Sequence, residues 1–249
     1  NYPSPTLTGS VMDDIVFVDE IIGVKIAISD HRSSNMTKES LIKLASDARV
    51  AGMLSGKPGI VHLHTGTGKA QLDMLFDIVA ETEIPIRTFR PTHLAAKYDA
   101  AIRFAKLGGY IDFTCDPDDM VNRSALLVRA LREAPAGSVT ISTDSNGSLP
   151  VWNERNEMIG IGAGHISALH DTICAMVKLQ HCPLEEALLP VTENVAKALE
   201  LYPAKGVLAA GSDADIVLLD SDMAIDTVYA MGRCMLKNKE MQVHANFEF

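Results

Sequence analysis

Strand-like runs alternate with helix-like segments through most of this chain, and that alternation limits the folds open to it. The expected strands are short, apolar and rich in β-branched residues: Gly23 to Ser29, Gly59 to Thr65, Ile86 to Arg90, Tyr110 to Cys115 and Val139 to Thr143. They recur at roughly 25 to 40 residue intervals, a spacing that leaves room for a helix between parallel strands. The number of such units favours a (β/α) barrel over a doubly wound sheet.

Apolar residues at helical spacing predict the intervening helices. The expected ranges are 11–22, 37–54, 70–80, 98–107, 120–133, 165–180 and 184–202. Thr37 is the expected cap of the second helix, and the Gly-rich stretch from Gly56 to Gly59 is expected to end it. The segment from Trp152 to Ile159 predicts a hairpin or an irregular excursion, and from Lys205 onward the pattern predicts short strands and turns.

Composition and charge restrict the classes of partner. With 249 residues and 47% hydrophobic content, the chain can form one large domain, or one domain plus a fragment. The net charge of −10 argues against nucleic acid, which needs a positive surface, and no apolar stretch is long enough to span a membrane. The four cysteines form no Cys-x-x-Cys pair, so we expect reduced thiols in a soluble, cytoplasmic protein.

Polar and charged residues occupy particular places in the expected strands. Val139 to Ser148 reads VTISTDSNGS, a β-branched run that stops at Asp144 and passes into turn residues. A barrel presents a catalytic acid or base in this way, at the carboxyl end of a strand. Lys25 interrupts an apolar run, where a lysine is costly unless it is used, although a strand-end lysine can also extend its ammonium to solvent.

Histidines lie on two successive strands. His62 and His64 are two residues apart, so their side chains point to the same face of a strand and can ligate one metal ion. His93 follows the next strand, one βα unit later. Together with Lys25 and Asp144, these residues are predicted to converge on metal.

The loop after the first strand carries a candidate for substrate binding. Arg32 lies there, on the side where barrel active sites are found. A guanidinium matches the two oxygens of a carboxylate, so Arg32 could bind an acidic substrate. A solvated loop arginine is the alternative interpretation.

Several motifs resemble those of a known family. The stretch from Lys205 to Asp220 resembles the carboxyl-terminal signature of the amidohydrolase superfamily. Within that superfamily, GVKIAISDHRSS, the strand closing on His64, the RPTH that ends at His93, and the STDSNGS around Asp144 resemble the isoaspartyl (β-aspartyl) dipeptidases. The likeness covers nearly the whole chain, with the motifs in the family's order.

This resemblance implies an α/β fold: a partial TIM-type (β/α)8 barrel, containing barrel strands four to eight, plus a short C-terminal segment of a β-sandwich domain. Residues 1–203 would form the metal-dependent hydrolase barrel, incomplete at its N-terminus, and residues 204–249 the β-sandwich segment. It also suggests a homo-oligomer.

The same resemblance implies a site with two zinc ions. Lys25 would carry a CO2-derived carboxyl group and bridge the metals, and His64 and His93 would bind the second ion. Asp144 would bind the first ion and act as general base and acid. His62 has no role in the family and is expected to lie behind the ligands.

On the substrate side, Arg32 would bind the α-carboxylate of the substrate and Ser148 would also contact it. The family's second arginine is missing after His93, where the chain reads Leu94 to Lys97. Lys97 could take its place.

The activity implied is zinc-dependent hydrolysis of the isopeptide bond of β-aspartyl dipeptides, with a small dipeptide as substrate. One alternative is an amidohydrolase acting on a cyclic amide, of the dihydroorotase or hydantoinase type. Another is a non-catalytic truncated barrel, because this chain contains no His-x-His before Lys25.

Overall fold

The computed structural model describes residues 6–29, 36–66, 68, 70, 72–145, 148–153, 155 and 157–244. Its central element is a set of parallel strands: β1 (Gly23–Ile28), β2 (Ile60–Thr65), β3 (Phe89–Thr92), β4 (Ile111–Thr114) and β5 (Val139–Ser142). β1, β2 and β3 pair in that order, and β4 pairs with β5. The Thr92 hydroxyl joins the two sheets by donating to the Asp112 carboxylate at 2.5 Å.

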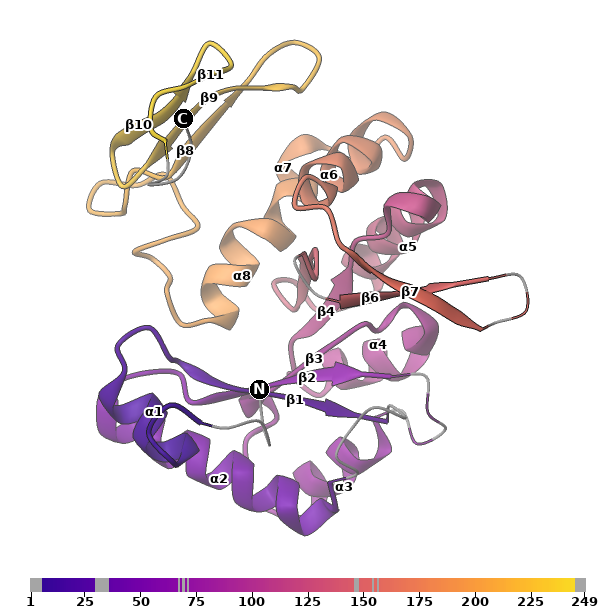
Figure 1. Cartoon of the computed structure of the whole chain (residues 1–249), viewed down its shortest axis with the longest axis vertical. Coiled ribbons are helices and arrows are strands. Elements are labelled where there is room, and N and C mark those ends of the chain that lie inside the picture. The colour runs from indigo at the N-terminus through magenta and orange to yellow at the C-terminus, as the bar shows by residue number, and fades with distance from the viewer. Residues whose placement is uncertain are drawn as a thin grey trace.

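Helices follow these strands in the βα order predicted (Figure 1). They are α1 (Val11–Phe17), α2 (Lys38–Ser55), α3 (Asp73–Glu81), α4 (Tyr98–Lys106), α5 (Met120–Glu133), α6 (Ala168–Lys178), α7 (Leu184–Leu188) and α8 (Glu193–Ala198). Short 3-10 turns lie at η1 (Ile86–Thr88), η2 (Ala95–Lys97), η3 (Pro117–Asp119) and η4 (Leu189–Val191). This arrangement is the partial (β/α) barrel that the sequence predicts.

Local signals explain where α2 begins and ends. The Thr37 side chain accepts a hydrogen bond from the Ser40 backbone N–H, as an N-cap residue does. At the other end Gly56 adopts a left-handed conformation with φ of 71°, which a residue without a Cβ reaches at low cost. Both ends agree with the prediction.

The core lies between the parallel strands and the helices. In β1 the residues Val24, Ile26 and Ile28 are buried, whereas Lys25 and Ala27 are only half-buried. In β2 the half-buried positions are His62 and His64. Alternation along a strand separates two faces, so one face packs on the helices and the other presents lysine and histidine side chains.

Several predicted boundaries were wrong. β3 begins at Phe89, because the preceding residues form the η1 turn, in which Thr88 donates its backbone N–H to Pro85. α1 ends at Phe17 instead of residue 22, and α3 begins at Asp73 instead of residue 70.

The long helix predicted over 184–202 was also wrong. The segment is divided into α7, η4 and α8, and Pro190 lies in the intervening turn. Proline has no backbone N–H to donate and its ring clashes with the preceding turn, so a continuous helix is disfavoured there.

Two antiparallel sheets follow the parallel strands. β6 (Ser148–Trp152) and β7 (Met158–Ala163) form an antiparallel pair, as the hairpin interpretation expected. The carboxyl-terminal sheet contains β8 (Ile216–Leu219), β9 (Ile225–Ala230), β10 (Arg233–Lys237) and β11 (Glu240–Met241), in the order β11-β10-β9-β8. The division at residues 203 and 204 stays a prediction.

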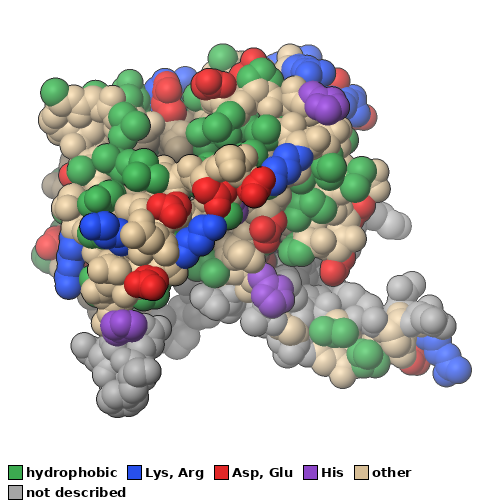
Figure 2. Space-filling model, turned by 90° about the horizontal axis from the view of Figure 1, so that it is seen from above, with side chains coloured by type: hydrophobic (Ala, Val, Ile, Leu, Met, Phe, Trp, Pro, Cys, Tyr) green, Lys and Arg blue, Asp and Glu red, His purple; other side chains and the backbone are tan. Residues whose placement is uncertain are grey.

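The surface is mixed in charge on the face seen in Figure 2, where basic and acidic side chains are interspersed among apolar ones. Lys205 pairs with Asp213 and Asp215 at 2.9 and 2.6 Å. None of the described helices combines the length and apolar character that a membrane span requires. All four cysteines are free thiols.

Candidate metal centre

Three predicted site residues meet at the carboxyl ends of the parallel strands. His64 lies near the end of β2, His93 follows β3, and Asp144 follows β5. Their ligand atoms all lie within 4.8 Å of one another. His93 Nε2 is 3.0 Å from His64 Nδ1 and 3.6 Å from Asp144 Oδ2. Because parallel strands end at one edge, residues far apart in sequence form one cluster.

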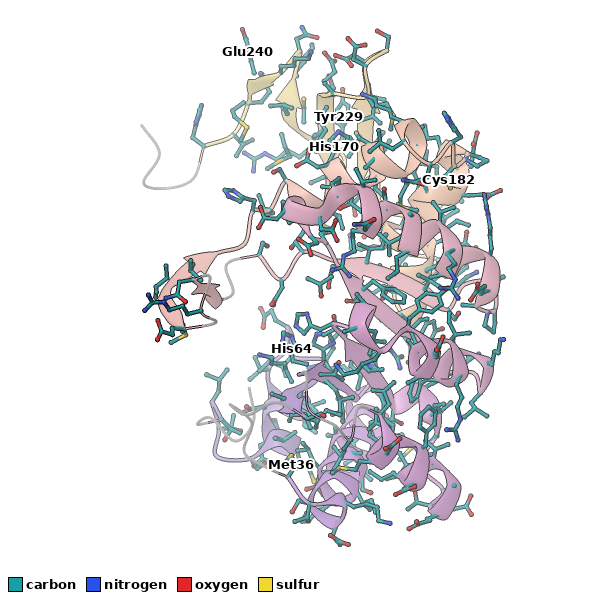
Figure 3. The ribbon with its side chains drawn as sticks, turned by 90° about the vertical axis from the view of Figure 1, so that its right-hand side faces the viewer. Met36, His64, His170, Cys182, Tyr229 and Glu240 are labelled. Carbon is teal, nitrogen blue, oxygen red and sulfur yellow. The ribbon has the colours of Figure 1, made fainter. Side chains whose placement is uncertain are left out.

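His64 lies on the strand face that points away from the outer helices (Figure 3). Its ring contacts the His93 ring edge-on at a centroid distance of 4.6 Å. The His93 ring is fixed on its other side, where Nδ1 lies 2.7 Å from the Thr114 hydroxyl. The two imidazoles are therefore held at an angle that turns one nitrogen of each toward Asp144.

The backbone is strained at two of the three residues. His93 has φ of 62° and Asp144 has φ of 50°, both in the left-handed region. Side chains with a Cβ adopt this region at a cost of about 1 to 3 kcal/mol, and such residues often cluster at functional sites. His93 comes directly after β3 and Asp144 two residues after the end of β5, and the unusual φ turns each side chain into the cluster.

The surroundings favour neutral imidazole. Burial lowers the pKa of His93, and the charges of Lys25 and Lys97 act in the same direction, while Asp144 and Asp112 oppose them. Neutral imidazole is the form that binds metal.

His62 is not among the clustered ligands. Burial also lowers its pKa, and its ring packs edge-on against His64 at a centroid distance of 5.1 Å. It also has a hydrogen bond to the backbone of Arg90. The structure therefore places His62 behind His64.

Lys25 lies opposite His62 in the β1–β2 register, and Ala27 lies opposite His64. Residues at alternate positions share a face, so Lys25 projects from the same face as both histidines. Its positive charge contributes to lowering the pKa of His62 and of His93. Lys25, the charged residue within an otherwise apolar strand, therefore lies beside the cluster.

The predicted substrate-binding residues are only partly visible. Arg32 lies outside the described residues, and so does the side chain of Ser148, whose backbone begins β6. Lys97 is buried at 5% exposure, and its Nζ donates to the carbonyl oxygen of Thr65 at 3.3 Å. It therefore lies close to the end of β2.

Sequence reasoning missed a polar group beneath the cluster. Asp112, in the middle of β4, is buried and accepts hydrogen bonds from Thr92, Thr140 and Ser142. The sequence pattern that could have predicted Asp112 is the one that indicated Lys25: a charged residue inside an otherwise apolar strand. Thr114 gave no such signal, because threonine is common in strands.

The donor set is suited to zinc. Two imidazole nitrogens and one carboxylate oxygen are the ligands of many catalytic zinc sites, which leave a further position for water or substrate. Carboxylate and imidazole also suit other divalent metals, so the ligands alone give a class of ion. His64, His93 and Asp144 bring three ligand atoms close enough together for metal to be held at this place.

Residues 13–235 match the model of the amidohydrolase family. The chain belongs to the amidohydrolase family. The matched range includes the parallel strands, the three clustered ligands and most of the carboxyl-terminal sheet.

Solved amidohydrolase-like structures include two of beta-aspartyl dipeptidase from Fervidobacterium islandicum AW-1. The one in complex with beta-Asp-Leu dipeptide is 41% identical with a TM-score of 0.90, and the match covers 98% of this chain and 64% of that chain. The second is 38% identical with a TM-score of 0.86, covering 98% and 63%. This amidohydrolase chain therefore spans less than two thirds of the length of those proteins.

A more distant likeness concerns the fold alone. Dihydropyrimidinase from Brevibacillus agri NCHU1002 is 17% identical with a TM-score of 0.61, covering 93% of this chain and 67% of that chain. At that identity it carries no information about the substrate of this amidohydrolase.

Proposed function

We propose that this protein hydrolyses the isopeptide bond of β-aspartyl dipeptides with a binuclear zinc centre. The observation that carries the proposal is the meeting of His64, His93 and Asp144 at the strand ends. The 41% identity to a beta-aspartyl dipeptidase, over 98% of this chain, supports the substrate class.

The proposed metal ligands combine the three clustered residues with the roles that the motif resemblance implies. His64 and His93 would hold one zinc, Asp144 the other, and a carboxyl group on Lys25 would bridge both. Bound zinc polarises a scissile carbonyl and makes water more acidic. Asp144 would accept a proton from the attacking water and return it to the leaving amine.

Carboxylation of Lys25 is a covalent step that the proposal requires. The Lys25 ammonium first loses a proton to solvent; the uncharged amine then attacks CO2, a new bond forms between Nζ and the carbon, and a second proton leaves to solvent. The product is an anion in place of a cation.

Arg32 and Ser148 are proposed to bind the substrate. A guanidinium pairs with both oxygens of an α-carboxylate, so Arg32→Met should raise KM for a dipeptide more than it lowers kcat. We also propose that the protein is a homo-oligomer in the cytoplasm. The free cysteines agree with a reducing compartment.

The decisive experiment combines metal analysis with a substrate panel. The protein, purified without chelator, is analysed for zinc per chain and assayed on β-Asp-Leu and on dihydroorotate. About two zinc ions per chain and hydrolysis of β-Asp-Leu are expected. Turnover of dihydroorotate alone would indicate the cyclic-amide alternative, and absence of both metal and turnover would indicate a non-catalytic barrel.

A further inference from the structure

Asp112 stands at the centre of a buried network of hydroxyl groups under the metal-ligand cluster. Asp112 is 9% exposed, and its carboxylate accepts hydrogen bonds from three side chains on two neighbouring strands. Thr92 Oγ1 donates at 2.5 Å, Ser142 Oγ at 2.6 Å and Thr140 Oγ1 at 2.8 Å. A threonine hydroxyl has one hydrogen, so the hydrogen of Thr92 is committed to Asp112.

The oxygen of Thr92 can then only accept from its next neighbour. Thr114 Oγ1 lies 3.4 Å from Thr92 Oγ1, the longest link in the network, and 2.7 Å from His93 Nδ1. If Thr114 turns its hydrogen toward Thr92, a lone pair of Thr114 faces the histidine. His93 Nδ1 must then carry the ring proton, because two lone pairs 2.7 Å apart would repel.

The opposite arrangement would disable the site. Thr114 would donate to His93 Nδ1, and the ring proton would lie on Nε2, pointing at His64 Nδ1 over 3.0 Å. In that tautomer the nitrogen that faces Asp144 and His64 has no lone pair for a metal. The two arrangements exclude each other, so the direction of the Thr92 and Thr114 hydroxyls decides which nitrogen of His93 is available.

We propose that Asp112 is a positioning residue that acts through Thr92 and Thr114 to hold the His93 proton on Nδ1, leaving Nε2 ready to bind metal. The carboxylate sets the direction of the chain of hydrogen bonds, although it lies two hydroxyl groups away from the imidazole. This inference rests on the proposed function, since it assumes that His93 is a metal ligand.

Matched variants separate this role from a contribution to stability. Thr92→Val and Thr140→Val each remove one hydroxyl bound to Asp112 and preserve side-chain shape, but only Thr92 lies between Asp112 and His93. Thr92→Val and Thr114→Val are expected to weaken zinc binding about tenfold or more, whereas Thr140→Val changes it less than about threefold. Thr114→Ser, which retains the hydroxyl, should restore binding. Equal weakening by Thr92→Val and Thr140→Val would overturn the proposal.

A second readout does not depend on metal or on mutation. Nitrogen-15 chemical shifts of the His93 ring in the metal-free, full-length protein distinguish the two tautomers. A protonated Nδ1 is expected, and a protonated Nε2 contradicts the proposal. If the wild-type protein bound no zinc, the proposed function would fail. The tautomer of His93 would still show whether the hydrogen bonds from Asp112 hold the ring proton on Nδ1.

Discussion

His93 Nε2 lies 3.0 Å from His64 Nδ1, although 29 residues separate the two histidines in the sequence. Zinc–nitrogen bonds of about 2.0 to 2.1 Å in tetrahedral geometry place two such ligands about 3.3 Å apart. The two nitrogens are therefore close to the separation that one zinc ion requires. Asp144 provides an oxygen beside them, at 3.6 Å from His93 Nε2.

Lys25→Ala is expected to lose zinc and most hydrolytic activity. Without the amine no bridging carboxyl group can form, and hydrolysis should fall on the order of a hundredfold or more, because metal supplies several kcal/mol of transition-state stabilisation. Zinc per chain and β-Asp-Leu turnover are the measurements. Lys43→Ala is the control, since Lys43 is an exposed lysine paired with Asp47 on α2. Full zinc content with normal turnover in Lys25→Ala would refute the bridging role.

Asp144→Asn tests the proposed proton transfer. The amide retains the size of the carboxylate but cannot accept the proton, so kcat should fall by about 10² to 10⁴. Asp116→Asn is the matched control, because Asp116 also follows a parallel strand but pairs with Arg123 at 3.1 Å. The measurement is kcat on β-Asp-Leu for both variants, and an equal effect of the two would argue against a special role for Asp144.

Arg90→Met should destabilise the fold. Arg90 is buried, donates from Nε and Nη2 to the Ala198 carbonyl at 3.0 and 2.7 Å, and lies over the Tyr110 ring at 4.5 Å. Methionine leaves that carbonyl without its donors, so the free energy of unfolding should fall by roughly 2 to 4 kcal/mol.

Arg87→Met provides the comparison for Arg90. Arg87 is exposed, donates to Gly108 at 3.3 Å and approaches the same Tyr110 ring at 5.7 Å. Its replacement should change the free energy of unfolding by less than about 0.5 kcal/mol. Urea denaturation of both variants measures the difference, and similar midpoints would show that the link to Ala198 contributes little.

Stability at high pH should depend on Tyr98. Burial, together with the hydrogen bond to Glu133 and its negative charge, raises the pKa of Tyr98 to about 12 from 10.0. A raised pKa means that the folded chain favours the protonated phenol. The contribution of the Tyr98 phenol to the free energy of unfolding is complete below about pH 10 and is lost as the pH rises toward about 12.

The test of Tyr98 is a series of urea denaturations over that range of pH. The free energy of unfolding of the wild-type protein should fall more steeply with pH than that of Tyr98→Phe, which lacks the ionisable group. Parallel curves would mean that the Tyr98 phenol has the same pKa in both states.

Local sequence was sufficient for much of the fold. The range of α5 was predicted to the residue, and the cap of α2 was expected at or near Thr37, because both depend on neighbours within one turn. Asp144 and His93 were predicted as site residues because each is a polar residue at the end of an expected strand, a pattern visible in the sequence. Pro190 shows the limit of periodicity, since the apolar spacing continued through a residue that cannot extend a helix.

What the sequence determined by itself was the order of strands and helices and the chemical types at the strand ends, because these follow from the local pattern of apolar and polar residues. Tertiary structure alone decided which polar residues meet. The register of β3, β4 and β5 brings Thr92, Thr140 and Ser142 to Asp112, and the left-handed turns at His93 and Asp144 direct their side chains to His64. Such contacts depend on strand pairing across tens of residues, which no local pattern specifies.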